Sequence, residues 1–125
     1  MQANLNEIEI NGKIYVSKDS IRGNCMAQKF DNMEYCVVRT FSAGVFAGYI
    51  ESRDGKEVVL RHARRIWKWA GAASLSQLAV DGTNAPNECM FPMPVDKVIL
   101  TEAIEIIPTT QKAKESIEAV PVWKK

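Results

Sequence analysis

The Asp54-Gly55 pair constrains the fold of this chain more than any other feature of its sequence. It separates two segments rich in β-branched and aromatic residues, Val45–Ser52 and Glu57–Leu60. Asp-Gly accepts the positive φ angles of a tight turn, so the pair predicts an antiparallel hairpin. Tyr35–Phe41 has the same β character and comes just before it. We therefore expect a meander of three antiparallel β segments within residues 34–69.

The remaining sequence predicts an α+β fold, mainly an antiparallel β-sheet with one or two short helices, in a single domain. Asn11-Gly12 lies within the alternating stretch Glu7–Val16, which predicts an N-terminal hairpin. The proline-rich stretch Thr83–Pro94 predicts a surface connection. Further elements are expected as follows: a helix near 72–81 that Asp81-Gly82 ends, strands over Val95–Leu100 and Ala103–Ile107, and a helix over Thr110–Val120 that Thr109 or Thr110 caps. The parts are then 1–33 (hairpin and loop), 34–108 (core sheet with the first helix) and 109–125 (second helix and tail).

Length and charge limit the class of protein. The 125 residues fit one domain, and the net charge of +1 argues against a protein that coats nucleic acid by bulk charge. No apolar run approaches the roughly 20 residues that cross a bilayer, and the polar N-terminus does not resemble a signal peptide. We expect a cytoplasmic protein without a membrane partner.

The sequence does not contain the usual cofactor or metal motifs. Cys25, Cys36 and Cys89 are odd in number and widely spaced, which is typical of reduced thiols. His62 is the only histidine, so sites built on two or more imidazoles are excluded. No phosphate-binding loop, serine elbow or zinc helix motif occurs. We therefore predict no cofactor, no metal and no enzymatic activity.

A basic and aromatic segment is the best candidate for ligand binding. No acidic residue occurs between Glu57 and Asp81. Arginines in this segment can grip phosphate oxygens and aromatic rings can stack on a purine, while small residues after the first strand allow close backbone approach. The candidate ligand-binding residues are Arg39, Ser42, Gly44, Phe46, Arg61, Arg64, Arg65, Trp67, Trp69, Asn84 and Phe91. In the alternative interpretation, the arginines pair with Glu51, Glu57 or Asp81 and the tryptophans fill the core.

Self-association is also expected. A small open sheet has at least two unpaired edges, and the apolar Val122-Trp123 pair near the C-terminus can dock on the domain or on another subunit. A symmetric homo-oligomer would bring arginines from several subunits together. Such a site would favour a ligand with several negative charges.

Several blocks of the sequence resemble a family of small phage and prophage proteins. These blocks are Tyr35–Thr40, Ser42–Gly48, Ser52–Leu60, Ala63–Leu78 and Thr101–Pro108. The family is similar to the phage Thoeris anti-defence sponges, which bind cyclic ADP-ribose signals or cyclic oligonucleotides without cleaving them and assemble as oligomers. The resemblance implies a non-enzymatic phage counter-defence protein that sequesters a cyclic nucleotide in the cytoplasm of the host bacterium. The resemblance does not assign a binding role to any particular residue of this chain.

Two other functions remain open at this point. The aromatic segment would also suit a phage structural or host-takeover module that binds another protein. Single-stranded nucleic acid is a third possible partner, but the nearly neutral charge makes nucleic acid unlikely.

Overall fold

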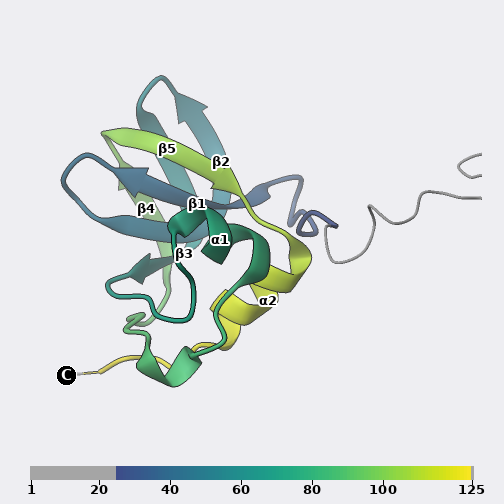
Figure 1. The fold of residues 1–125 in the computed structure, drawn as a ribbon. Coiled ribbons are helices and arrows are strands. Elements are labelled where there is room, and N and C mark those ends of the chain that lie inside the picture. The colour runs from purple at the N-terminus through teal and green to yellow at the C-terminus, as the bar shows by residue number, and fades with distance from the viewer. Residues whose placement is uncertain (1–24, 125) are drawn as a thin grey trace, which may run out of the picture.

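The computed structural model describes residues 25–124, so the hairpin predicted around Asn11-Gly12 lies outside the described residues. The described chain folds into a five-stranded antiparallel sheet with two α-helices (Figure 1). The strands lie in the order β4-β3-β2-β1-β5. The elements are β1 (Glu34–Thr40), β2 (Val45–Asp54), β3 (Glu57–Ile66), α1 (Leu75–Asp81), the 3-10 helix η2 (Pro86–Glu88), β4 (Val95–Leu100), β5 (Ala103–Pro108) and α2 (Gln111–Ala119). The predicted α+β class is confirmed.

The predicted central meander is present, with one change at its turn. Asp54 pairs with Glu57, so the two turn residues are Gly55 and Lys56 rather than Asp54 and Gly55. Gly55 has a φ of 62°, a conformation that glycine adopts without steric cost. The third β segment continues beyond the predicted Leu60 as far as Ile66.

Both helices begin at the hydroxyl caps that their sequences provide. The Gln77 amide donates to Ser74 Oγ, and the Ala113 amide donates to Thr110 Oγ1. The first helix therefore begins at Leu75, three residues after the predicted start, and Gly82 follows its last residue as predicted. Together, α1 and α2 lie on one side of the sheet (Figure 1). No helix among residues 25–124 has the length and apolar character that a membrane crossing requires.

The two faces of the sheet bury separate cores. One face packs against the helices and includes Tyr35, Val37 and Tyr49. The opposite face is the concave side of the curled sheet. It buries residues such as Val38 and Leu60, which we call the concave core. The curl is fixed where the edge strand β5 meets the tip of the β2–β3 hairpin, because the Ala103 amide donates to the Lys56 carbonyl at 3.0 Å.

A bulge in β3 reverses which residues face each core. Ala47 pairs with Arg64 and Tyr49 pairs with Arg61, so Gly48 faces two residues of β3, His62 and Ala63. One extra residue shifts the two-residue side-chain alternation to the other face. As a result, Arg64 points to the helix-covered core, where its side chain is buried.

The segments after β3 pack onto the same domain. The predicted surface connection contains η2, but its Phe91 is completely buried. Val122 forms a parallel bridge with Phe91, and the Trp123 amide donates to the Phe91 carbonyl at 3.0 Å. The sequence allowed the apolar Val122-Trp123 pair to dock on its own domain or on another subunit. In the structure it packs on its own domain.

Candidate functional site

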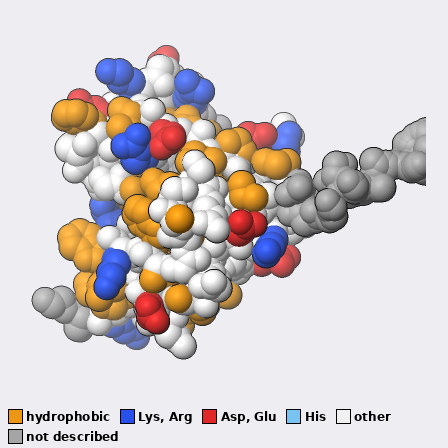
Figure 2. Space-filling model, in the orientation of Figure 1, with side chains coloured by type: hydrophobic (Ala, Val, Ile, Leu, Met, Phe, Trp, Pro, Cys, Tyr) orange, Lys and Arg blue, Asp and Glu red, His pale blue; other side chains and the backbone are white. Residues whose placement is uncertain are grey.

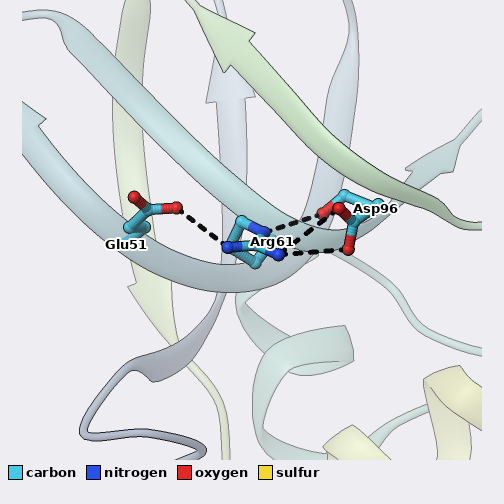
Figure 3. A network of polar contacts seen from close by, with 3 residues as sticks. All are labelled: Glu51, Arg61 and Asp96. Carbon is cyan, nitrogen blue, oxygen red and sulfur yellow. Dashed lines mark hydrogen bonds and ion pairs between the residues drawn. The ribbon is translucent and has the colours of Figure 1, made fainter.

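Two of the candidate arginines are neutralised by carboxylates of the same chain. Arg61 lies between Glu51 and Asp96, with Nη1 3.3 Å from Glu51 Oε1 and Nη2 3.2 Å from Asp96 Oδ1 (Figure 3). The hydrogen bonds to Asp96 and then to Glu51 raise the pKa of Arg61. Arg39 Nε lies 2.9 Å from Glu105 Oε1. The alternative interpretation is therefore confirmed for the pair of Arg61 with Glu51, whereas Asp96 and Glu105 were not among its expected partners.

A third candidate arginine, Arg64, is buried and held by backbone carbonyls. Its side chain is part of a residue only 5% exposed, and it donates to the carbonyls of Pro92, Phe91 and Ile117 at 3.0, 3.1 and 2.9 Å. Burial lowers its pKa. No carboxylate among residues 25–124 pairs with it, and Ile117 lies in the last turn of α2, where the helix dipole favours a cation. Arg64 therefore brings a positive charge into the interior.

The fourth arginine lies on a separate surface at the β1–β2 loop, which we call the loop-end surface and define by Phe41, Ser42, Gly44, Arg65 and Trp67. Arg65 donates to the Ala43 carbonyl and lies 4.4 Å from the centre of the Phe46 ring. No carboxylate among the described residues pairs with it. A Cβ added to Gly44 would lie 3.5 Å from Arg65 Nη1, so the loop and the guanidinium are neighbours.

Several aromatic and loop candidates are not available to a ligand, because they are buried or already hydrogen-bonded within the chain. Phe46 is buried in the concave core. Phe91 is buried beneath the C-terminal segment. In the loop of small residues where close backbone approach was expected, the Ala43 amide already donates to Thr40 Oγ1 at 2.9 Å. Trp67 is 65% exposed, whereas Trp69 packs partly against the helix-covered core. The two indoles therefore do not form one stacking face.

The predicted residues do not form one broad basic site. Asn84 is exposed in the connection before η2. Arg39 is also exposed but is bound to Glu105, and Ser42, Gly44, Arg65 and Trp67 are exposed at the loop-end surface. On the face shown in Figure 2, Lys and Arg side chains are interspersed with Asp and Glu, and no continuous basic patch appears there.

The structure instead contains an aromatic pocket that the sequence did not predict. Its volume is about 490 Å³, within the range of small-molecule sites. Phe30, Tyr49 and His62 form one wall, with the Phe30 ring centre 5.4 Å from that of Tyr49 and 5.3 Å from that of His62. The residues that line the aromatic pocket are Phe30, Tyr35, Tyr49, His62, Arg64, Pro94, Glu118, Val120 and Val122.

A tight turn and the β3 bulge, both with left-handed backbone angles, bring side chains to the aromatic pocket. Asp31 and Asn32 have φ values of 49° and 66°, and Phe30 and Met33 exchange both backbone hydrogen bonds around them, as in a type I′ turn. This turn places Phe30 on the pocket. His62, the extra residue of the bulge, has a φ of 52°. Left-handed conformations of residues other than glycine are often found at functional sites.

The charges around the aromatic pocket favour an anion. Lys114 Nζ lies 5.6 Å from the ring centres of both Tyr35 and Tyr49 and 3.1 Å from Glu118 Oε1. Burial works against the Lys114 charge, but Tyr49 and Glu118 outweigh this effect, so its pKa is raised. Burial also raises the pKa of Tyr35, which therefore stays neutral. With Lys114 paired to Glu118, the Arg64 charge remains without a balancing acid among residues 25–124.

The arrangement has features that can bind a planar ligand. A planar ring can contact the aromatic wall, and His62 can donate or accept a hydrogen bond. No group of three or more potential metal ligands occurs among residues 25–124.

The sequence carried two partial signals for the aromatic pocket. The Asp31-Asn32 pair suits a tight turn, and the segment from Arg61 to Ile66 breaks the alternation of a regular strand.

Comparison with known proteins gives one match. Residues 33–117 match the model of a family described as Domain of unknown function (DUF6948). This region includes Tyr49, His62 and Arg64 of the aromatic pocket but not Phe30. No curated protein and no solved structure was found to match the chain.

Proposed function

This chain belongs to the DUF6948 family, for which no function is assigned, and we propose that it is a non-catalytic protein that binds and sequesters a cyclic nucleotide in its aromatic pocket. One observation carries the proposal. The aromatic pocket combines aromatic walls with the buried charge of Arg64, which no acid among residues 25–124 balances. A ligand that complements both features has a planar ring and a negative charge.

Cyclic nucleotides match the size and chemistry of the aromatic pocket. A base stacked on Phe30 or Tyr49 would gain about 1–3 kcal/mol. His62 and Lys114 lie next to these rings and can donate to phosphate oxygens. A cyclic ADP-ribose isomer or a cyclic oligonucleotide presents both groups. The loop-end surface has exposed aromatic and basic groups as well, but its residues do not line the aromatic pocket.

The resemblance to phage sponges supports sequestration rather than conversion of the ligand. In this proposal the protein acts in the host cytoplasm as a homo-oligomer that removes an immune signal. Tight binding without turnover requires a rigid pocket and no activated nucleophile. The buried Arg64 and the packed aromatic wall meet the first requirement.

The test is to incubate the purified protein with cyclic ADP-ribose isomers and with cyclic oligonucleotides. Binding is measured by calorimetry, and the ligand is recovered after heat denaturation and identified by mass spectrometry. We expect one of these ligands to bind and to return intact. Loss of the intact ligand, or no binding by any member of the series, would contradict the proposal.

Variants then locate the site. Phe30→Ala removes one aromatic wall and should weaken binding about tenfold, the equivalent of one lost stacking contact. Phe41→Ala is the matched control, because Phe41 is an exposed phenylalanine of the loop-end surface. If Phe41→Ala or Trp67→Ala abolished binding while Phe30→Ala did not, the ligand would use the loop-end surface instead.

A further inference from the structure

The edge strand β5 borders a groove where the curled sheet does not close. Pairing between β1 and β2 ends at Glu34 and Ile50, so the distal part of β2 extends beyond β1. Opposite this part lies β5, the last strand of the sheet, which among the described strands pairs with β1 only (Figure 1). Two cavities of about 220 and 490 Å³ occupy the space between them, and Arg53 and Ile106 line both. We call these two neighbouring cavities together the edge groove.

The free side of β5 favours an extended backbone. Apart from Ala103, whose amide donates to the Lys56 carbonyl, this side has no strand partner among residues 25–124. An unpaired strand edge presents a row of backbone donors and acceptors that another strand can satisfy. Ile104 is 47% exposed at this edge, which leaves apolar surface to be covered as well.

The side chains of the edge groove favour alternating apolar and acidic residues in its occupant. Ile50 and Ile106 pack against the concave core, so apolar side chains placed beside them would extend that core. Lys29 and Arg53 line the groove together with Glu34. Glu105 also lines it but is already bound by Arg39 at 2.9 Å. With Glu105 neutralised in this way, Lys29, Arg53 and Glu34 give the edge groove a net charge of +1.

We propose that the edge groove binds an extended peptide strand of another protein, which pairs with β5 and places acidic side chains near Arg53 and Lys29. This interaction is separate from ligand binding in the aromatic pocket. A second copy of this chain suits the groove less well. Two copies paired through β5 about a two-fold axis would bring their groove cations together, and like charges at such short range repel each other.

The test uses a labelled ten-residue peptide of alternating isoleucine and glutamate with the full chain. The control peptide alternates isoleucine and lysine, which keeps the β propensity and reverses the charge. We expect the glutamate peptide to bind at least tenfold more tightly by fluorescence anisotropy. Hydrogen exchange should show new protection of the β5 amides when it binds.

Matched variants at the two sheet edges make the test specific. Ile104→Lys places a charge on β5, and Ile99→Lys does the same on β4, where Ile99 is 56% exposed. We expect Ile104→Lys to weaken the glutamate peptide at least tenfold and Ile99→Lys to change it less than twofold. Arg53→Glu, at an exposed position, should reverse the preference toward the lysine peptide.

Four results would overturn the proposal. The first three are failure of the glutamate peptide to bind, equal binding by Ile104→Lys, and equal affinity for both peptides. The fourth is protection, before any peptide is added, of those β5 amides that do not pair with β1. The last result would mean that another part of the chain or a second copy already pairs with β5. Sedimentation of the peptide-free protein would then distinguish these two occupants.

Discussion

Arg64 and Arg65 are adjacent in sequence but have opposite environments. The Arg64 guanidinium is buried and bound to the carbonyls of Pro92, Phe91 and Ile117. Arg65 is exposed and donates to one loop carbonyl, that of Ala43. Because the Arg64 bonds join β3, the η2–β4 connection and α2, this side chain connects segments that are far apart in the sequence. We therefore assign Arg64 a structural role as well as a place in the aromatic pocket.

Replacement of Arg64 by a neutral side chain of similar length should destabilise the fold. Arg64→Met leaves buried carbonyls without donors, each at a cost of about 1–3 kcal/mol, so we expect a loss of about 3 kcal/mol in the free energy of unfolding. Urea denaturation measures this loss. Arg65→Met is the matched control and should change the same free energy by less than about 1 kcal/mol. Equal effects of the two variants would show that the carbonyl bonds of Arg64 contribute little.

The cysteines should differ strongly in reactivity. Cys25 is exposed, whereas Cys36 and Cys89 are buried. Burial raises the pKa of Cys36 to about 12, so its thiol is protonated at neutral pH and does not attack electrophiles. A coloured disulfide reagent should therefore label Cys25 quickly and the other two thiols only after denaturation. In the Cys25→Ser control the fast phase should be absent, and a fast phase that remained would contradict the assigned burial.

At the scale of elements, the bulge in β3 connects the sheet to the aromatic pocket. Gly48 faces the bulge, and a Cβ added there would lie 3.1 Å from both Ala63 Cα and the Arg61 carbonyl oxygen. These neighbours are backbone atoms, which cannot move aside easily. The absence of a side chain at Gly48 therefore allows β3 to carry the extra residue that places His62 on the aromatic pocket.

Gly48→Ala should destabilise the protein by about 1–3 kcal/mol, because the added methyl group forces the backbone of β3 to shift. Thermal or urea unfolding measures the loss. Gly55→Asn provides the control, since Gly55 has a positive φ that asparagine tolerates and nothing lies within 4 Å of an added Cβ. A small effect at Gly48 would mean that the bulge is less rigid than its geometry indicates.

His62→Gly separates stability from binding. His62 has a positive φ, which costs a residue with a side chain about 1–2 kcal/mol. Glycine adopts this angle without strain but loses more backbone entropy on folding, so we expect the free energy of unfolding to rise by up to about 1 kcal/mol. The same change removes the imidazole from the aromatic pocket. We expect a higher midpoint of thermal unfolding together with weaker nucleotide binding by calorimetry. A lower midpoint, or unchanged binding, would contradict the role given to His62.

The elements that alternate regularly could be predicted from the sequence, and the site could not. β4 has the predicted bounds, β5 extends one residue beyond its predicted end, and β1 begins and ends one residue before prediction. The candidate site depended on arginines without acidic neighbours in sequence. Arg61 finds Asp96 across the β3–β4 pair, and Arg64 finds carbonyls 27, 28 and 53 residues away. Such partners follow from tertiary packing, which a local pattern does not contain.

At the scale of the whole molecule, the C-terminal segment forms part of the wall of the aromatic pocket. Val120 and Val122 form this part of the wall, and the bridge between Val122 and Phe91 attaches the segment to the domain. The Trp123 amide adds a hydrogen bond to the Phe91 carbonyl. The same short segment therefore contributes to the stability of the domain and to the shape of the aromatic pocket.

Removal of residues 121–125 should affect both properties. We expect the free energy of unfolding to fall by about 1–2 kcal/mol, because Val122 and Trp123 no longer cover apolar surface. Nucleotide affinity should fall in parallel, because one wall of the aromatic pocket is lost. Removal of residues 124–125 alone is the control, since it keeps Val122 and Trp123. Unfolding in urea measures the first effect and calorimetry the second. If stability fell while affinity did not, the ligand would bind away from this wall, and the loop-end surface would be the next site to test.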